Sequence, residues 1–457
     1  MRPILAIAAI TIRTAIRSKI VISLLAILLA LIVGLPLTVK SDGTLAGQVE
    51  IIIGYTLGIA GTLLSMATLW AGCAAVSSEI QEKQIQMLVA KPVHRAQVWL
   101  GKWAGLMAMN SLLLLVCVAA TYGLLRWSLR PSQLSDADRG RLENEIFVAR
   151  REIRPPLPDV EARARAQFVD MMKKGQISKN ADPDDALEAI RRNFRAVDGA
   201  VPPGNGRSWP IDLPERVADD AELTVRFKFA MSSVERNPIA CVWFAGTPEN
   251  SRLFRVSQTN VPLAFHEFQI PARVLHGGTA LMLSYANTDD SGVTVMFGND
   301  DSLAVLVPVG GFAANMARGA LIVLAQLAFL SALGVTAGTI FSLPVAGFTS
   351  LFMVLLLFSG GMVGELSATK YIVGDARSTS VWEAAANTTL RSMYRALNAV
   401  VSPMDFDMPW DEVATARMVS WTRVEKAMLV NVLIYGGLVA LFGAYVFNRR
   451  EVALPQN

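Results

Sequence analysis

Apolar and polar residues follow one another along this chain in long blocks rather than in short periods. Six apolar runs are each long enough to cross the roughly 30 Å of hydrocarbon in a bilayer. They are Ile20–Val39, Ile51–Val76, Trp103–Leu125, Phe312–Thr336, Pro344–Val363 and Ala427–Phe447. This pattern predicts an α-helical membrane protein with six transmembrane helices. With 53% hydrophobic and only 18% charged residues, the composition excludes an ordinary soluble protein.

Basic residues outside the apolar runs set the expected orientation. Met1–Lys19 has Arg2, Arg13, Arg17 and Lys19 at helical spacing, which is typical of an amphipathic helix on the inner membrane surface. The polar loop 77–102 also carries four basic residues. Because such residues favour the cytoplasmic side, we expect a multi-pass cell-membrane protein, of the bacterial inner membrane, with both termini cytoplasmic. This first domain, 1–126, would hold the surface helix and three spans.

The loop between the second and third apolar runs has a helical pattern of its own. Ser78 and Gln81 are spaced as a capping box, with Glu79 and Glu82 in the first turn. An apolar stripe follows at helical spacing, and Pro92 ends the helix because it disfavours the helical conformation of Lys91. The stripe consists of Ile80, Gln84, Met87 and Leu88. The loop therefore predicts a short amphipathic helix between two membrane helices.

This loop resembles the cytoplasmic loop of ABC-2 type permeases, the membrane subunits of one class of ABC exporter. The matching residues, in order, are Glu79, Leu88, Lys91-Pro92, Arg95 and Gly101-Lys102, while Gln84 stands where Thr is common in the family. An aromatic residue followed by Arg449-Arg450-Glu451 after the last span is similar to a recurrent ending in the family. The resemblance covers the membrane parts and not the long polar stretch.

The resemblance implies that the loop docks on a separate ABC ATPase subunit. The implied docking residues are Glu79, Ile80, Glu82, Lys83, Gln84, Met87, Leu88, Lys91, Pro92 and Arg95. It also implies a second permease copy or a homologous permease as partner, within membrane lipid. The simpler alternative is a solvated connector between two helices.

The sequence contains neither the motif of an ATPase nor the intramembrane charges typical of an ion-coupled carrier. It has no Gly-x-x-x-x-Gly-Lys-[Ser/Thr] phosphate loop, so we expect no ATP hydrolysis, no enzymatic activity and no cofactor. The spans hold almost no ionisable residues away from their ends, which argues against an ion-coupled carrier. Gln326 and Ser331 could line a path or form interhelical hydrogen bonds. Gly54, Gly58 and Gly61 predict close helix packing, within the chain or between two copies.

A polar insert, 127–308, separates the third and fourth spans and is expected outside the cytoplasm. Its first part, 133–199, reads as helical, with Asp182 as an N-cap and Pro183 at the first helical position. Its second part, 207–308, predicts an antiparallel β-sandwich, for which the jelly roll is one candidate type. The strands expected there are Leu223–Phe229, Ala240–Phe244, Leu253–Val256, Glu267–Ile270, Leu281–Tyr285, Val293–Phe297 and Leu303–Val307.

Candidate chemistry in this α+β insert is sparse. His266 and His276 are isolated, and no catalytic constellation surrounds them. Three Asp-Asp pairs could bind calcium, although acidic turns between strands are commoner; they are Asp219-Asp220, Asp289-Asp290 and Asp300-Asp301. Three dispersed cysteines predict neither a disulfide framework nor a metal site. A net charge of +4 gives no case for nucleic-acid binding.

The last domain, 309–457, would hold three spans and an outer segment, 364–426, in which Arg391–Val401 predicts an amphipathic helix at the membrane surface. The sequence leaves two functions open. One is the permease subunit of an ABC-2 type exporter that moves an unidentified substrate outward. The other is a membrane scaffold that presents the insert to a partner without transport; a membrane-anchored enzyme is a third reading that no catalytic group supports.

Overall fold

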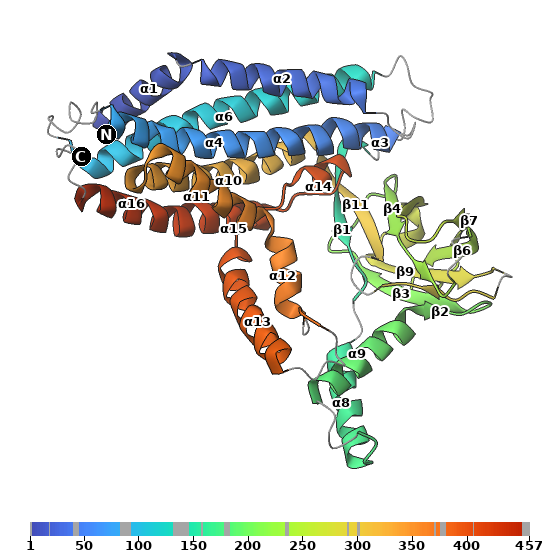
Figure 1. Ribbon diagram of the computed structural model, residues 1–457. Coiled ribbons are helices and arrows are strands. Elements are labelled where there is room, and N and C mark those ends of the chain that lie inside the picture. Colours follow the sequence, from blue (N-terminus) through green and yellow to red (C-terminus); the bar gives the residue numbers. More distant parts are fainter. Residues whose placement is uncertain are drawn as a thin grey trace. The chain divides into compact units, whose positions relative to one another are not determined.

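The chain divides into two compact units. One consists of Met1–Phe147 and Gly311–Asn457, and the other of Val148–Gly310. Figure 1 shows the elements of both in a computed structural model. The residues described are 2–17, 19–39, 45–82, 93–130, 146–156, 159–177, 183–233, 237–289, 292–298, 302–369, 372–374, 381–404 and 406–449.

The first unit is a bundle of long helices (Figure 1). Its N-terminal elements are α1 (Arg2–Arg17), α2 (Ile20–Thr38), α3 (Leu45–Glu50), the π-helix η1 (Ile51–Tyr55), α4 (Thr56–Gln81) and α6 (Arg95–Ser128). Its C-terminal elements are α10 (Phe312–Ile340), α11 (Leu343–Phe358), α12 (Gly360–Ala368), α13 (Val381–Val401), α14 (Trp410–Ala414), α15 (Trp421–Ala427), the π-helix η5 (Met428–Gly436) and α16 (Gly437–Arg449).

Within the described residues, five helices are long and apolar enough to cross a membrane. They cover Val21–Thr38, Gly47–Gln81, Arg95–Ser128, Phe312–Ile340 and Trp421–Arg449. A sixth span requires α11 and α12 to count as one, although the chain bends by 61° between them. The prediction of a helical membrane part is thus confirmed, and the fifth predicted span, Pro344–Val363, corresponds to this bent pair.

Helix α10 is the centre of the bundle. In its membrane-length window 78% of residues are buried, against 11% for α2 at the rim. It packs against α4 so closely that glycine is required on both helices. A Cβ on Gly334 would lie 2.7 Å from the Leu69 carbonyl oxygen, and one on Gly338 would lie 2.5 Å from the Cys73 carbonyl oxygen. Gly72 meets Gly334 in the same way, at 3.0 Å.

The N-terminal helix α1 packs along α6 through a second glycine contact. A Cβ on Gly101 would lie 2.7 Å from the Ile7 Cβ, and one on Gly105 would lie 2.9 Å from the Ala8 carbonyl oxygen. Ile7 and Ala8 are buried, whereas Leu5 and Ile10 on the other face are exposed. The predicted basic surface helix is therefore a helix with one face fixed to the bundle.

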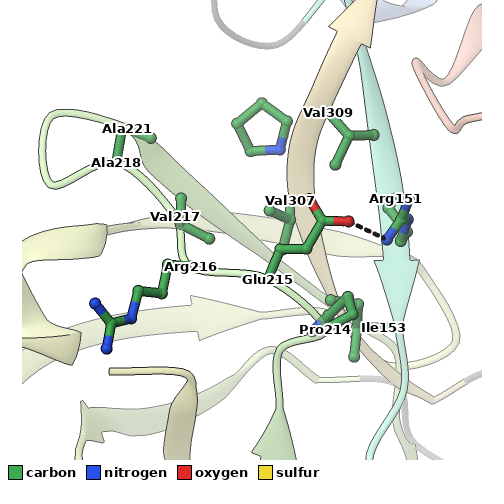
Figure 2. A pocket seen from close by; sticks show the side chains of 11 residues that line it. Arg151, Ile153, Pro214, Glu215, Arg216, Val217, Ala218, Ala221, Val307 and Val309 are labelled. Carbon is green, nitrogen blue, oxygen red and sulfur yellow. Dashed lines mark ion pairs between the residues drawn. The ribbon is translucent and has the colours of Figure 1, made fainter. Parts of the chain in front are cut away.

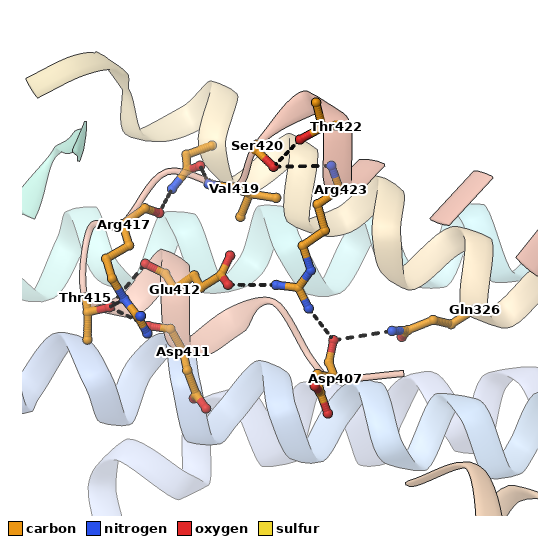
Figure 3. Close-up of polar contacts among 11 residues, drawn as sticks. Gln326, Asp407, Asp411, Glu412, Thr415, Arg417, Val419, Ser420, Thr422 and Arg423 are labelled. Carbon is orange, nitrogen blue, oxygen red and sulfur yellow. Dashed lines mark hydrogen bonds and ion pairs between the residues drawn. The ribbon is translucent and has the colours of Figure 1, made fainter. Parts of the chain in front are cut away.

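The chain returns into the bundle between α13 and α15. Trp410 on the short helix α14 is 1% exposed and lies against Gly319 of α10 and Gly61 of α4. Figure 3 shows the polar contacts of this segment with α10. Asn315 donates to the Arg417 carbonyl oxygen (2.7 Å) and accepts from the Val419 N–H (2.8 Å). The buried amide side chain of Asn315 thus bonds the segment to the central helix through both its donor and its acceptor.

The arginines of this segment, which are unusual on the expected outer side, have local partners. Arg423 pairs with Glu412 at 2.8 Å and donates to the Asp407 carbonyl oxygen at 3.1 Å (Figure 3). Gln326 of α10 donates to the same carbonyl oxygen at 3.4 Å. Arg318 donates to the Val419 carbonyl oxygen, at 3.3 Å. Arg423 therefore has a carboxylate partner within the segment, whereas Arg318 of α10 bonds a backbone carbonyl oxygen of the segment.

The second unit contains two four-stranded sheets, in the orders β1-β11-β4-β8 and β3-β9-β6-β7, and a small sheet β2-β10-β5. The long strands are β1 (Val148–Ile153), β3 (Gly206–Asp212), β4 (Glu222–Phe227), β6 (Ile239–Gly246), β7 (Phe254–Asn260), β8 (His266–Pro271), β9 (Ala280–Asn287) and β11 (Leu303–Gly311). The short ones are β2 (Ala200–Val201), β5 (Ala230–Met231) and β10 (Val295–Met296).

The long strands pair in a nested order. The innermost pair is β6 with β7, followed outward by β4 with β8, β3 with β9, and β1 with β11. The pairs β6–β7, β4–β8 and β3–β9 are antiparallel, which confirms antiparallel sheets in the insert. A long paired ribbon rolled into two sheets is the jelly-roll arrangement.

Aromatic side chains fill the space between the two sheets. The ring of Trp243 on β6 lies 4.7 Å from that of Phe227 on β4, 5.5 Å from Phe268 on β8 and 5.0 Å from Tyr285 on β9. All four side chains are buried. One core therefore joins both sheets. Buried and outward-facing positions alternate along β9, whereas β11 begins with five buried residues in a row.

The stretch predicted as helical, 133–199, is only partly so. Its later part forms α8 (Val160–Lys173) and α9 (Pro183–Gly199), whereas Val148–Ile153 is the edge strand β1. The prediction missed this strand because its Val-Ala-Arg-Arg-Glu-Ile sequence lacks alternation and its partner β11 lies about 150 residues further along the chain. Pro183 starts α9 as expected, and Asp182 lies outside the described residues.

The glycine contact between α4 and α10 can be tested by adding a methyl group. Gly334→Ala should lower the free energy of unfolding by about 1–3 kcal/mol, because its Cβ would collide with backbone atoms. Gly58→Ala is the matched control, since no atom of the described chain lies within 4 Å of that Cβ position. It should leave stability unchanged or raise it by up to about 1 kcal/mol. Denaturant unfolding in detergent measures both, and equal effects would refute the contact.

The pairing of α8 with α9 should depend on pH. Arg191 donates two hydrogen bonds of 2.7 Å to Glu161, and these lower the pKa of Glu161 below its ordinary value. A carboxylate with a lowered pKa stabilises the fold above its unfolded pKa and loses that effect as the pH falls through the folded pKa. The protection of the α8 and α9 amides, measured relative to the intrinsic exchange rate at each pH, should therefore fall below about pH 4.5. Glu161→Gln should make this fall smaller, leaving the part that comes from the Arg163–Asp198 ion pair between the same helices, and an unchanged fall would contradict the assignment.

Candidate functional site

The predicted docking loop joins the ends of α4 and α6 in the first unit. The structure describes its two flanks, Ser77–Glu82 and Val93–Lys102. The centre of the loop lies outside the described residues, and with it the predicted docking residues Lys83, Gln84, Met87, Leu88, Lys91 and Pro92. What can be seen is how the loop is anchored to the bundle.

A buried ion pair closes the base of the loop. Lys102 of α6 lies 2.6 Å from the Glu79 carboxylate of α4, and its ammonium also donates to the Ala75 carbonyl oxygen at 2.6 Å. The Lys102 side chain is only 2% exposed and that of Glu79 21%. Glu79 near the C-terminus of a helix would be unfavourable by itself, so Lys102 compensates both the carboxylate and the helix dipole. The pair ties α4 to α6.

Glu79 does not open a new helix as predicted. Helix α4 continues through it to Gln81, and the Ser78 hydroxyl donates to the Ala74 carbonyl oxygen instead of capping an N-terminus. The predicted capping box is therefore wrong. The helix continues because no Gly or Pro lies between Cys73 and Glu82. The change from apolar to polar residues therefore marks the end of the apolar run and not the end of the helix.

Arg95 connects the other flank of the loop to the last helix. Its guanidinium donates to the carbonyl oxygens of Phe447 (2.7 Å) and Asn448 (3.2 Å). These carbonyls belong to the last turn of α16, whose unpaired acceptors and dipole favour a cation. Arg95 also lies over the Phe447 ring, at 5.9 Å. The predicted docking residue Arg95 thus serves the chain's own helix end.

Two residues that sequence reasoning did not select complete the anchor. Ser77 donates to the carbonyl oxygens of Gly338 and Phe341, at 3.1 and 3.3 Å, and so ties α4 to the end of α10. The Trp99 indole donates to Thr336, whose hydroxyl donates to the Val439 carbonyl oxygen of α16, each at 3.2 Å. Their partners lie more than 200 residues away, so no local pattern could have indicated them. The ends of α4, α6, α10 and α16 are thereby joined.

The surface of the anchor that remains open is small and polar. Gln81 and Glu82 are exposed at the end of α4, and Ile80 is half-buried. His94 is exposed before α6, where it forms a capping box with Gln97. The arrangement can present the loop to a partner while four helix ends are held together beneath it.

The predicted packing glycines do not all serve one contact. Gly54 and Gly61 face the returning segment: the nearest atoms to their Cβ positions belong to Asp411 and Met408, at 3.4 and 3.2 Å. No described atom lies within 4 Å of the Cβ position of Gly58. Of the predicted glycines, Gly54 therefore packs against the short helix α14. The close contact between α4 and α10 is made by Gly72, Gly334 and Gly338 instead.

Polar residues in the middle of the bundle bond to one another. Thr68 donates to Asn110 (3.0 Å), and Asn110 donates to Ser331 (3.3 Å), which links α4, α6 and α10. All three side chains are at most 1% exposed. Ser331 thus takes part in interhelical hydrogen bonding, as does Gln326 towards Asp407.

The described residues of the β-unit form a pocket and no metal-binding cluster. His266 bonds the Val261 carbonyl oxygen, Asp289 accepts from the Ala240 N–H, and no cluster of metal-ligating side chains occurs in the described parts of the chain. Asp290, Asp300 and Asp301 lie outside those parts. A pocket of about 330 Å³ lies between β1, β11 and the loop after β3. Figure 2 shows Arg151 and Glu215 facing each other across it, 3.7 Å apart.

Comparison of the chain with protein-family models, curated proteins and solved structures gives no match.

The buried ion pair predicts a non-additive mutational response. Glu79→Gln should lower the free energy of unfolding by about 3 kcal/mol, because Lys102 would keep a buried charge without its carboxylate. Adding Lys102→Met should recover most of the loss. Glu82→Gln, at the exposed position one turn on, should stay within about 0.5 kcal/mol. Unfolding in detergent measures all three, and additive losses in the double variant would argue against the pair.

Proposed function

We propose that this chain is the membrane subunit of an ABC-2 type exporter, with six spans, cytoplasmic termini and the β-unit outside the cytoplasm. A separate ATPase subunit would hydrolyse ATP, and a second permease copy or a homologous permease would complete the transport path. The observation that carries the proposal is the anchored base of the loop. A loop that only connected α4 to α6 would not need side-chain contacts that also bind α10 and α16.

The anchor supports a way for work on the loop to reach the bundle. A push on the loop by a closing ATPase dimer would act on α4 and α6 together through Glu79 and Lys102. Arg95 would pass the displacement to α16, and Ser77 to α10. Because α10 contacts α4 along glycines without intervening side chains, the two helices would move as one body. Such coupling would open or close a path between this subunit and its neighbour.

The docking claim can be tested on the loop centre. Glu82→Lys with Leu88→Asp should weaken complex formation with an ATP-binding-cassette ATPase that co-purifies with the wild-type chain by at least about tenfold, since charged substitutions at a docking surface remove its anchors. Glu79 is left intact because its loss would disturb the anchor. Ser257→Asp, on an exposed position of β7, is the matched control. Co-purification and ATPase stimulation are the measurements, and unchanged values in the loop variant would refute docking.

One observation favours a second function, a membrane scaffold that presents the β-unit to a partner. The loop between β7 and β8 exposes Val261, Leu263 and Phe265, each more than 40% exposed. Leu263 is held at φ 64°, an uncommon conformation for a leucine, and its N–H donates to the Phe229 carbonyl oxygen at 2.7 Å. A rigid apolar loop suits protein contact. The absence of an ATP-binding-cassette gene beside this one would favour the scaffold.

A further inference from the structure

The helices α12 and α13 form a hairpin that leaves the bundle (Figure 1). Helix α11, which precedes them, has 16 residues. At 1.5 Å per residue it is about 24 Å long, less than the roughly 30 Å of hydrocarbon that a complete span must cross. The chain then bends by 61° into α12, and α12 and α13 run across the long axis of the bundle.

The base of the hairpin lies beside the middle of the membrane helices. Val401 at the end of α13 is buried in a core with Phe329 and Leu357. The Tyr435 hydroxyl donates to the Val400 carbonyl oxygen at 3.0 Å. Phe329 and Tyr435 lie near the middle of α10 and of the Trp421–Arg449 helix, respectively. The hairpin therefore starts within the depth of the bundle and not beyond its end.

The hairpin has a defined internal structure. Asn387 of α13 accepts hydrogen bonds from the N–H groups of Ile372 and Val373, at 2.8 and 2.9 Å, and donates to the Val373 carbonyl oxygen at 3.0 Å. A Cβ on Gly360 of α12 would lie 3.2 Å from Val401. The two helices are thus held together at both ends, so the faces of α13 that point away from α12 are fixed.

One of these faces is uncharged and uncovered. Helical spacing places Trp382, Thr389, Met393 and Val400 in a single row along α13. Trp382, Met393 and Val400 are 63%, 54% and 54% exposed. Met362 of α12 is 64% exposed as well. In water this surface would be a substantial apolar patch on an otherwise ordered element.

The opposite face of α13 is cationic. Arg391 and Arg395 lie about half a turn away from the uncharged row. Arg395 is exposed, and Arg391 is half-buried with its Nε atom covered. Neither guanidinium forms an ion pair with a carboxylate of the described residues. A helix with one uncharged face and arginines on the other suits the boundary between acyl chains and headgroups, where a tryptophan is also favoured.

We propose that the α12–α13 hairpin binds phospholipid. The hairpin lies in the plane of the membrane, in the leaflet reached by the end of α11. The row from Trp382 to Val400 contacts acyl chains, and Arg391 and Arg395 bind headgroup phosphates, for which planar guanidinium groups are well suited. The hairpin follows directly on α11, which lies in the membrane-crossing bundle. The uncharged face of α13 is therefore exposed to the surrounding lipid, and we take lipid as what covers it. This inference does not depend on an ATPase partner.

Depth-dependent quenching tests the uncharged face. In the full chain in nanodiscs of phosphatidylcholine and phosphatidylglycerol, a nitrobenzoxadiazole probe is attached to Met393→Cys or, as control, to Thr388→Cys on the polar side. The three native cysteines are buried, and labelled wild-type protein corrects for them. Lipids spin-labelled on the acyl chain should quench the probe at 393 several-fold more than that at 388. Equal quenching would overturn the proposal, and so would an unquenched 393 probe combined with a 393–393 disulfide between two copies.

Lipid selectivity tests the cationic face. Co-purified phosphatidylglycerol relative to phosphatidylcholine should fall about fivefold for each arginine in Arg391→Gln and Arg395→Gln, and stay constant in Thr388→Gln. Millimolar inorganic phosphate should not displace the lipid. Unchanged selectivity in both arginine variants would overturn the headgroup contact, and displacement by phosphate would show a site for a free anion instead. ATPase docking should be unaffected in all of these variants, which separates failure here from failure of the proposed function.

Discussion

The close approach of α4 and α10 is the constraint on which the bundle depends. At Gly72, Gly334 and Gly338 the two backbones touch, and any side chain there would meet backbone atoms that cannot rotate away. Without a driving force from water, membrane helices gain most from such close packing and from interhelical hydrogen bonds. The bond chain from Thr68 through Asn110 to Ser331 lies on the same helices and adds directional contacts to the glycine contact.

Around this pair, the remaining contacts fasten the helix ends. On one side the loop anchor joins α4, α6, α10 and α16 through Lys102, Arg95 and Ser77. Elsewhere along α10, Trp410 and Asn315 hold the returning segment between α4 and α10. Helix carbonyls and amides that would lack partners in lipid are satisfied by these side chains. The bundle is therefore a rigid pair of helices whose neighbours are fixed by specific polar contacts.

The sequence predicted features that depend on period and length, and missed those that depend on distant partners. Apolar run length was enough to place the membrane helices, and alternation was enough for strands such as β4 and β9. The capping box predicted at Ser78 was wrong because the same local residue pattern can also occur within a helix that continues, as α4 does here. Glu79, Arg95 and Lys102 stand out in the sequence as parts of one motif, but their partners across the bundle were not deducible from it. The same limit hid β1 and the return of α14 between two helices.

The position of α10 also has a consequence for the order in which the protein is made. The ribosome completes α2, α4 and α6, and then the whole β-unit, before it reaches the helix around which they pack. Until then the glycine face of α4 has no neighbour, and the amide of Asn110 lacks its serine acceptor. The nested pairing of the jelly roll brings its first and last strands, β1 and β11, side by side. Pairing of β1 with β11 brings the end of the β-unit back beside its beginning. Helix α10, which follows β11, therefore starts close to the point where the chain left α6.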